Sequence, residues 1–368
     1  MLDFLKNKKN YFLGVDFGTS SVKIVELYYK DTKVYLSNYG VIDFGNESGK
    51  LNYAERKDDI VKHIKAILNK MDVKTNQINA AIPGQSGLSV VVEFPEMDEE
   101  ELGKAVKLEA GKHIPSPLDE VFLSWDLVSR PKTEGALVKK SKKEGGMEER
   151  GKMEVLLVAA LKNEVLKYED VAKASDLGIN SLELDVFSIA RAFVGEELGT
   201  FLIVDIGFKS SNLILVDKGT VKISRSLSVG GNEITNLIKT TLNTSWDEAE
   251  KIKKSDREFF DPSGQVSLIP VFNSIVSEAK RIIEEFHKKE GDSRRVDNII
   301  ISGGTSKLKG VNGYFTKTLG VEAITGNPWK RVLHKDPRLD SMMEELGASF
   351  SVALGLALKG ADDYSRKQ

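Results

Sequence analysis

The sequence contains two copies of one short pattern, and this repeat restricts the possible folds more than any other feature. "VDFGTSSVKIVEL" (15–27) and "VDIGFKSSNLILV" (204–216) both read Val-Asp-apolar-Gly, then a polar turn, then an apolar strand. A serine stands five residues after the aspartate in each copy (Ser21 and Ser210), and the copies lie 189 residues apart. Two hairpins of the same design in the two halves of one chain predict two related α/β domains that face each other.

The residues of both turns suit a phosphate group and its metal ion. Glycine lets the backbone approach a ligand closely, and the N–H groups of a turn form an anion-binding nest. Asp16 and Asp205 end the first strand of each hairpin, where a carboxylate can hold Mg²⁺ through a water molecule. The alternative is two ordinary hairpins with polar turns. The predicted phosphate-binding residues are Gly18, Thr19, Ser20, Ser21, Lys23, Gly207, Lys209 and Ser210.

Three other segments could complete a nucleotide site. A buried strand over 298–302 runs into a glycine pair that would allow an adenine or ribose to lie against the backbone. A second glycine pair precedes the predicted helix that begins near 232. These segments supply Gly230, Gly231, Gly303, Gly304, Thr305 and Lys307. On the helix predicted over 270–289, Glu278 and Arg281 share one face and either contact base and ribose or form a surface ion pair.

The composition narrows the class of protein. The chain has 40% hydrophobic and 29% charged residues, a net charge of −2, four histidines and no cysteine. The near-neutral charge gives no electrostatic reason to expect nucleic acid binding, and the lack of cysteine excludes disulfides and thiolate metal sites. The four histidines stand well apart, which argues against a histidine-rich metal centre. No apolar run reaches the ~18–20 residues that span a bilayer, so we expect a cytoplasmic protein.

Two charged segments each allow two interpretations, and two helix ends can be predicted. Leu2, Phe4 and Leu5 stand against three lysines, as in a short amphipathic tether or a frayed terminus. Residues 130–152 carry many charges and few apolar side chains, which predicts a flexible loop; its lysine cluster at 139–143 is either a ligand site or solvated. We also predict a helix that ends at Gly178 and a final helix over 340–358.

In this order, the elements resemble the actin/Hsp70/sugar-kinase ATPase superfamily, whose two phosphate hairpins and adenosine motif match Asp16–Lys23, Asp205–Asn212 and Gly303–Leu308. The block 79–165 stands where FtsA and its relatives carry subdomain 1C. Within it "LEAGKHIPSPLDEVFLSWDLV" resembles the PilM family of type IV pilus assembly proteins, as do the opening "LGVDFGTSSVKIVEL" and the closing "SFSVALGLALKG".

The resemblance implies an α/β actin-like ATPase fold, with two duplicated domains around a nucleotide cleft and an FtsA-type 1C subdomain. Its expected divisions are 1–78 (subdomain 1A, first part), 79–165 (1C, with the loop 130–152), 166–199 (1A, second part), 200–345 (domain 2) and 346–368 (a returning helix and polar tail).

The resemblance also implies a function, that of an ATP- and Mg²⁺-binding adaptor at the inner face of the cytoplasmic membrane. Members bind the N-terminal cytoplasmic segment of PilN in a groove between 1A and 1C and link it to the motor ATPases and platform protein. Here Leu102, Val106 and Ile114 either line that groove or belong to the core. For hydrolysis the segment before the second hairpin offers Glu183 and Asp185, of which Asp185 is the weak catalytic candidate.

Two other classes of function stay open. One is an FtsA-like filament-forming protein, although the polar end "KGADDYSRKQ" lacks the apolar face of an amphipathic membrane helix. The other is a sugar-kinase-type phosphotransferase, which would need a catalytic aspartate in a substrate pocket.

Overall fold

The computed structural model describes residues 10–44, 56–129, 151–291 and 294–368, which form two compact units. The first unit comprises residues 1–85 and 164–368, and the second comprises residues 86–163. The N-terminal tether and all but the last two residues of the loop predicted over 130–152 lie outside the described residues; Lys152 already begins a strand.

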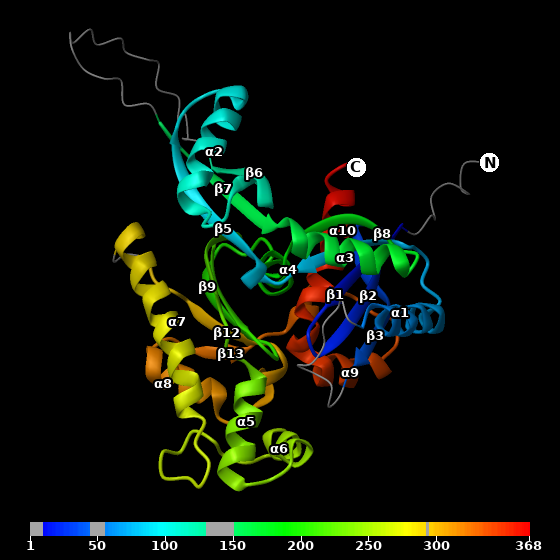
Figure 1. Cartoon of the computed structure of the whole chain (residues 1–368), viewed down its shortest axis with the longest axis vertical. Helices are drawn as coiled ribbons and strands as arrows, with labels where there is room; N and C mark the ends of the chain where they lie inside the picture. The colour runs from blue at the N-terminus through cyan, green and yellow to red at the C-terminus, as the bar shows by residue number, and fades with distance from the viewer. Residues whose placement is uncertain (1–9, 45–55, 130–150, 292–293) are drawn as a thin grey trace. The chain divides into compact units, whose positions relative to one another are not determined.

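The first unit contains two five-stranded sheets of the same topology (Figure 1). In the first sheet the strand order is β3-β2-β1-β4-β8, and in the second it is β11-β10-β9-β12-β13. Each sheet has three antiparallel strands from a hairpin unit followed by two strands in parallel. The first sheet consists of β1 (Asn10–Phe17), β2 (Ser21–Lys30), β3 (Lys33–Asp43), β4 (Gln77–Ile82) and β8 (Gly178–Leu184). The second consists of β9 (Thr200–Ile206), β10 (Ser211–Asp217), β11 (Thr220–Leu227), β12 (Asn298–Ser302) and β13 (Ala323–Thr325). The internal repeat therefore extends from the hairpins to whole sheets.

Helices cover these sheets and bury their apolar faces. Their bounds are α1 (Lys57–Met71), α3 (Lys162–Ala174), α4 (Asp185–Phe193), α5 (Gly231–Leu242), α6 (Trp246–Lys253), α7 (Ile269–Glu290), α8 (Val311–Leu319), α9 (Arg338–Leu346) and α10 (Ser351–Ser365). One hydrophobic cluster joins the second sheet to α5, α7 and α8, and another joins β2 and β3 to α10. Among the described residues, no helix is long and apolar enough to cross a membrane.

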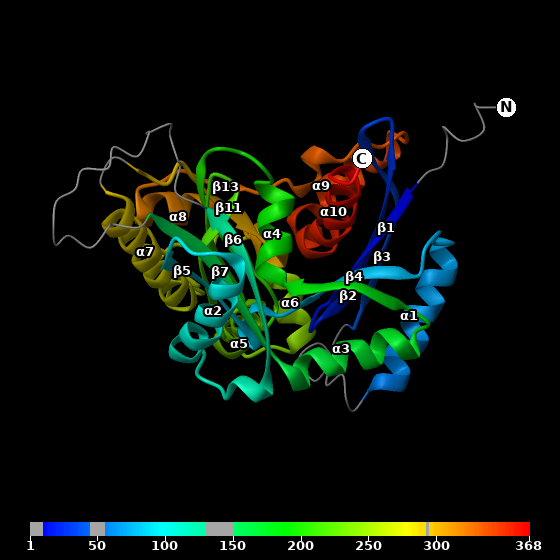
Figure 2. The same ribbon diagram turned by 90° about the horizontal axis from the view of Figure 1, so that it is seen from above.

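Helix α10 is buried along most of its length and contacts both β1 and α4 (Figure 2). Glycines permit this close approach. A Cβ atom at Gly14 would lie 2.1 Å from the carbonyl oxygen of Ala353, and one at Gly355 would lie 1.9 Å from that of Ser188. The apolar C-terminal sequence is thus a central core element that holds the first sheet against α4.

The second unit is a three-stranded antiparallel sheet with one helix against it. Its strand order is β5-β7-β6, from β5 (Gly87–Pro95), β6 (Val121–Ser129) and β7 (Lys152–Leu161), and α2 spans Glu99–His113. Asp98 caps α2, because its carboxylate accepts the N–H of Glu101 at 2.8 Å. Leu102, Val106 and Ile114 are buried in the core between α2 and this sheet.

The structure differs from the predicted elements at two helix ends. Helix α3 ends at Ala174 and the chain turns at Asp176, whose φ is +61°, so Gly178 is the first residue of β8 and not a helix cap. The predicted helix over 340–358 is two helices, α9 and α10, separated at Gly347, whose φ is +41°.

The compact second unit begins at Ser86, whereas the predicted division falls at residue 79. Strand β4 accounts for the difference, because it pairs with β1 and β8 in the first sheet.

Candidate nucleotide site

The two hairpins have the same register at their turns. Asp16 stands opposite Lys23 across β1 and β2, and Asp205 stands opposite Asn212 across β9 and β10. In both turns the glycine packs against the carbonyl of the residue three positions later. A Cβ atom at Gly18 would lie 2.7 Å from the oxygen of Ser21, and one at Gly207 would lie 2.9 Å from that of Ser210. The backbone of both turns thus requires glycine because of its own carbonyl, while the close approach of a ligand to these glycines stays a prediction.

The rest of both turns is partly exposed, and three of its four residues are polar. Thr19 and Ser20 lie between β1 and β2, and the carbonyl of Ser20 accepts the N–H of Phe44 at 3.0 Å. Phe208 and Lys209 occupy the matching positions of the second turn. These residues follow the ends of β1 and β9, close in sequence to Asp16 and Asp205.

Asp205 is buried and Asp16 is partly buried, and they lie close enough together for the charge of Asp16 to affect the ionisation of Asp205. Burial raises the pKa of Asp16, and Lys23, whose Nζ lies 3.9 Å from Asp16 Oδ2, partly offsets the rise. Burial and the charge of Asp16 raise the pKa of Asp205 to about 6. The Ser302 hydroxyl, which donates a hydrogen bond of 2.6 Å to Asp205, lowers this pKa and offsets part of the rise. The two turns therefore bring two carboxylates of the repeat into one electrostatic cluster.

Asp185 is the third carboxylate of this cluster. It begins α4, and its Oδ1 accepts the backbone N–H of Gly84 at 2.9 Å, while its Oδ2 accepts the side-chain amide of Asn212 at 3.0 Å. Burial, and then the charge of Asp205, raises the pKa of Asp185 to about 7. Three carboxylates from β1, β9 and α4 thus share one site in which Lys23 opposes their charge.

The start of α5 packs directly on the second turn. The N–H of Gly231 donates to the carbonyl of Gly207 at 2.9 Å, and the N–H of Asn232 donates to that of Phe208 at 2.8 Å. A Cβ atom at Gly230 would lie 2.6 Å from the Phe208 oxygen. The glycine pair therefore sets the position of the helix N-terminus beside the turn.

The third predicted motif also meets the second hairpin. Gly303 has a φ of +81°, and a Cβ atom there would lie 2.3 Å from the carbonyl oxygen of Ile206, which immediately follows Asp205. Gly304 has open space where its Cβ would be, Thr305 is buried, and Lys307 ends the same short turn. The backbone at Gly304 is accessible to a ligand without any rearrangement.

A polar cluster on α5 and α6 adjoins Gly231 and was missing from the predicted site. Lys253 Nζ donates to Thr235 Oγ1 at 2.8 Å and to Glu250, and reaches the carbonyl of Gly231 at 3.3 Å. Burial lowers the pKa of Lys253. The sequence signal is the i, i+3 spacing of Glu250 and Lys253 on a short helix, which is too common to single out a site.

Asn212 and Tyr168 are two further residues of the site that the sequence did not single out. Asn212 occupies in the second copy of the repeat the position that Lys23 occupies in the first, and its Oδ1 accepts the Ser226 hydroxyl at 2.7 Å. The buried ring of Tyr168 on α3 lies 5.7 Å from that of Phe17, next to Asp16. Burial raises the pKa of Tyr168, and the charges of Asp16 and Asp185 add to this effect.

The remaining predicted residues form ion pairs. Arg281 donates to Glu278 at 2.9 Å, and Arg225 of β11 lies 3.8 Å from the same carboxylate, so the structure contains the ion pair named as the alternative to base and ribose contacts. Glu183 of β8 accepts two hydrogen bonds from Arg191 of α4, at 2.6 and 2.9 Å. This ion pair joins the strand to the helix.

The duplicated sheets and their paired aspartate turns define a protein of the actin-like ATPase fold. MreB5 of Spiroplasma citri, solved bound to ADP, shares this fold with a TM-score of 0.51 and 14% identity, covering 98% of this chain and 99% of that chain. The chain belongs to the PilM family, because the family model described as type IV pilus assembly protein PilM matches residues 14–361.

Two other relatives agree with this family. The solved PilM-PilN type IV pilus biogenesis complex matches with a TM-score of 0.77 and 26% identity, over 95% of this chain and 98% of that chain. Cell division protein FtsA of Streptococcus pneumoniae is 21% identical over 98% of this chain and 86% of its own length.

Proposed function

We propose that this protein is an ATP-binding adaptor of the type IV pilus inner-membrane assembly complex. The observation that carries the proposal is the convergence of Asp16, Asp185 and Asp205 between two glycine turns of identical register. The phosphates would lie against the two turns, and the nucleoside against Gly230, Gly231 and the 303–307 turn.

The donor set fits Mg²⁺ held through water. Among the described residues, no group of three or more His, Cys, Asp or Glu side chains could hold a metal ion by itself. Mg²⁺ usually keeps several waters and takes one or two carboxylates together with phosphate oxygens. The raised pKa values of Asp16 and Asp205 reflect buried charge that Lys23 only partly opposes. A divalent cation, which the bound nucleotide would help to hold, would relieve this excess of negative charge.

Hydrolysis would depend on Asp185, for which we propose the role of orienting a water molecule. Its carboxylate is fixed by Gly84 and Asn212, and a pKa of about 7 would allow it to accept a proton at neutral pH. Both of its oxygens already accept hydrogen bonds within the protein, so we expect turnover to be weak or absent. The site would then hold ATP more than it consumes it.

The first experiment tests nucleotide binding by titration of a fluorescent ATP analogue with Mg²⁺ or EDTA. Asp16→Asn and Asp205→Asn should each weaken Mg²⁺-dependent binding at least tenfold, about 1.4 kcal/mol. Asp170→Asn, at an exposed aspartate of α3 paired with Lys57, is the matched control and should bind normally. Equal affinity for all variants would exclude this site.

The adaptor role rests on the family and on the likeness to a PilM-PilN complex. We propose that the chain binds the cytoplasmic N-terminal segment of PilN, that nucleotide strengthens this binding, and that it links PilN to the motor ATPases and platform at the inner face of the membrane. A PilN N-terminal peptide should be retained more strongly with ATP and Mg²⁺ than without. If neither nucleotide nor Asp16→Ala alters retention, the coupling is wrong, although the adaptor role is not.

A filament-forming protein is the second candidate function, favoured by the similarity to FtsA over 98% of the chain. Sedimentation distinguishes the two, because a polymer should pellet with ATP and Mg²⁺ and an adaptor should stay in the supernatant.

A further inference from the structure

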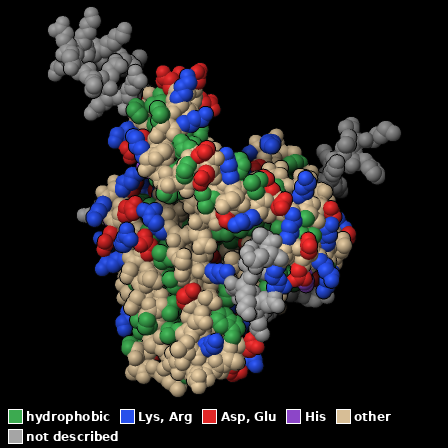
Figure 3. Space-filling model, viewed as in Figure 1, with side chains coloured by type: hydrophobic (Ala, Val, Ile, Leu, Met, Phe, Trp, Pro, Cys, Tyr) green, Lys and Arg blue, Asp and Glu red, His purple; other side chains and the backbone are tan. Residues whose placement is uncertain are grey.

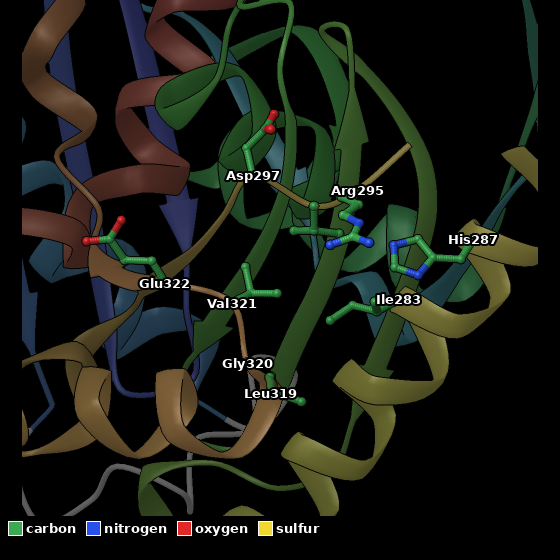
Figure 4. Close-up of a pocket in the computed structure, with 9 residues that line it drawn as sticks. Ile283, His287, Arg295, Asp297, Leu319, Gly320, Val321 and Glu322 are labelled. Carbon is green, nitrogen blue, oxygen red and sulfur yellow. The ribbon is translucent and has the colours of Figure 1, made fainter. Parts of the chain in front are cut away.

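A hollow of about 510 Å³ lies in the first unit at the C-terminal end of α7 (Figure 4), and none of the residues that line it belongs to the proposed nucleotide site. Residues 295–297, before β12, and residues 319–322, between α8 and β13, form the rest of its lining. Sites for small ligands in proteins measure roughly 300–1,000 Å³, so the hollow has the size of a small-ligand site.

Two nitrogen-bearing side chains of the lining, those of Arg295 and His287, are directed into this hollow. Figure 4 shows the guanidinium of Arg295 and the imidazole of His287 directed towards the same space. The Nε2 atom of His287 is shielded from solvent and has no hydrogen-bond partner among the described residues. Among the residues that the structure describes, no carboxylate forms an ion pair with Arg295. A buried nitrogen without a partner is unfavourable, and a ligand that supplies an acceptor would remove that cost.

The two acidic side chains of the lining do not supply this acceptor. The carboxylates of Asp297 and Glu322 point away from His287 in Figure 4. Asp297 accepts the backbone N–H of Thr200 at 2.8 Å, and Glu322 accepts the side-chain amide of Asn298 at 3.3 Å. Both carboxylates are therefore engaged elsewhere, yet they remain at the rim of the hollow.

The charge and shape of the hollow favour one class of ligand. A guanidinium binds a carboxylate or phosphate through two parallel hydrogen bonds. One guanidinium balances one negative charge, and the rim carboxylates would repel a dianion more than a monoanion, which favours a carboxylate over a phosphate. The side chains of Ile283, Leu319 and Val321 provide an apolar wall beside Arg295.

We propose that this hollow binds an organic monocarboxylate that carries a branched apolar group, with the carboxylate between Arg295 and His287. Two sources share this chemistry, a free branched-chain acid and the C-terminal residue of a peptide. The site does not depend on the nucleotide function proposed above, since the two share no residue.

The test is a titration of the full-length protein observed through the NMR signals of its four histidine imidazoles, with His287 assigned by His287→Gln. The probes are N-acetyl-leucine for a peptide end, 4-methylpentanoate for a free acid, and N-acetyl-leucinamide, which lacks the carboxylate. We expect a saturable shift of the His287 signal with the first or second probe, and the tighter of the two identifies the source.

Variants connect the shift to this geometry. Arg295→Gln should lower the affinity for the carboxylate probe at least tenfold. Lys288→Gln, at the exposed neighbour of His287, should leave this affinity unchanged. The proposal is wrong if N-acetyl-leucinamide shifts the His287 signal as much as N-acetyl-leucine. It is also wrong if Arg295→Gln binds as well as the natural protein, or if inorganic phosphate binds more tightly than both acids.

Discussion

Asp185 lies in the partly buried carboxylate cluster, and its ionisation opposes folding. Its pKa rises from 3.8 to about 7, and that of Asp205 rises to about 6. Between pH 4 and pH 7 the folded protein thus holds protons that the unfolded chain has already lost. By proton linkage the free energy of unfolding falls as pH rises through this window, when no cation or nucleotide is present.

Asp185→Asn removes one of these charges while it keeps a side chain of the same shape, and it gives up one of the two hydrogen bonds accepted from Gly84 and Asn212, which offsets part of the gain. We expect the free energy of unfolding without nucleotide to increase by about 2 kcal/mol at pH 8, with the difference shrinking towards pH 4. Urea unfolding of both proteins at several pH values measures this difference in the free energy of unfolding. Asp256→Asn, at a 94% exposed side chain, is the control and should show no such pH dependence. A variant no more stable than the natural protein at pH 8 would contradict the electrostatic account of the cluster.

Gly304 gives a separate test of where the nucleoside lies. A Cβ atom at this position would meet no atom within 4 Å, so Gly304→Ala should leave the melting temperature unchanged. If a nucleotide covers this backbone, the added methyl group should nevertheless weaken ATP binding about tenfold. Gly313→Ala, equally open but on the exposed part of α8, should affect neither quantity by much. Unchanged ATP affinity in both variants would place the nucleoside elsewhere.

Sequence and structure agree best at single residues where a local rule decides the conformation. The repeat identified Gly18 and Gly207, because a turn in contact with its own carbonyl requires glycine wherever it occurs. Asn212 and Tyr168 were missed for the opposite reason. Their positions depend on α4 and β1, elements far from them in sequence, and neither residue type carries a chemical signal on its own.

At the scale of elements, α10 shows why an apolar C-terminal sequence is central to the fold. Arg191 on α4 joins the two helices, since it donates to the carbonyl of Gly355 at 3.0 Å while it pairs with Glu183. Because α4 also begins with Asp185, the packing of α4 against α10 helps to fix the position of Asp185 in the candidate site.

Gly355→Ala tests this contact. The added Cβ would lie 1.9 Å from the carbonyl oxygen of Ser188, so the two helices must separate. Overpacking of this kind typically costs about 1–3 kcal/mol, and we expect a loss of that size in urea unfolding. Gly313→Ala on α8 serves as the control, where replacing a helical glycine should be neutral or slightly stabilising. A stable Gly355→Ala variant would show that α4 and α10 are not rigidly packed.

The sequence predicts most strands and helices, because alternation and 3.6-residue spacing are visible in single segments. The two errors occurred where tertiary structure determines a glycine's role. Gly178 begins β8 and packs against the side chain of Gln77, while Asp176 makes the preceding turn. Gly347 breaks the helical pattern between α9 and α10, and the sequence alone does not separate a helix-breaking glycine from a tolerated one.

At the scale of the molecule, the second unit has a hydrophobic core of its own. The cluster around α2, β5, β6 and β7 shares no residue with the two clusters described above for the first unit. The chain also enters and leaves this unit at neighbouring points, because Gly87 and Ala160 stand opposite each other on adjacent antiparallel strands. Such an arrangement is that of an insertion into an otherwise continuous domain.

We therefore expect the first unit to fold without the second. Replacing residues 88–159 by a two-residue Asn-Gly turn between Gly87 and Ala160 follows the geometry of a natural hairpin. The shortened protein should unfold cooperatively and bind ATP and Mg²⁺ within about threefold of the full chain, since Asp16, Asp185 and Asp205 all belong to the first unit. Calorimetry and the fluorescent ATP titration measure these quantities.

The same shortened protein also tests the division of labour between the two units. If the second unit is needed for the partner, the PilN N-terminal peptide should no longer be retained, with or without nucleotide. The Asp16→Asn variant of the full chain is the complementary control, because it should lose ATP while the second unit stays intact. Loss of ATP binding in a folded, shortened protein would mean that the nucleotide site needs the second unit. Full retention of the peptide would place the partner surface on the first unit alone.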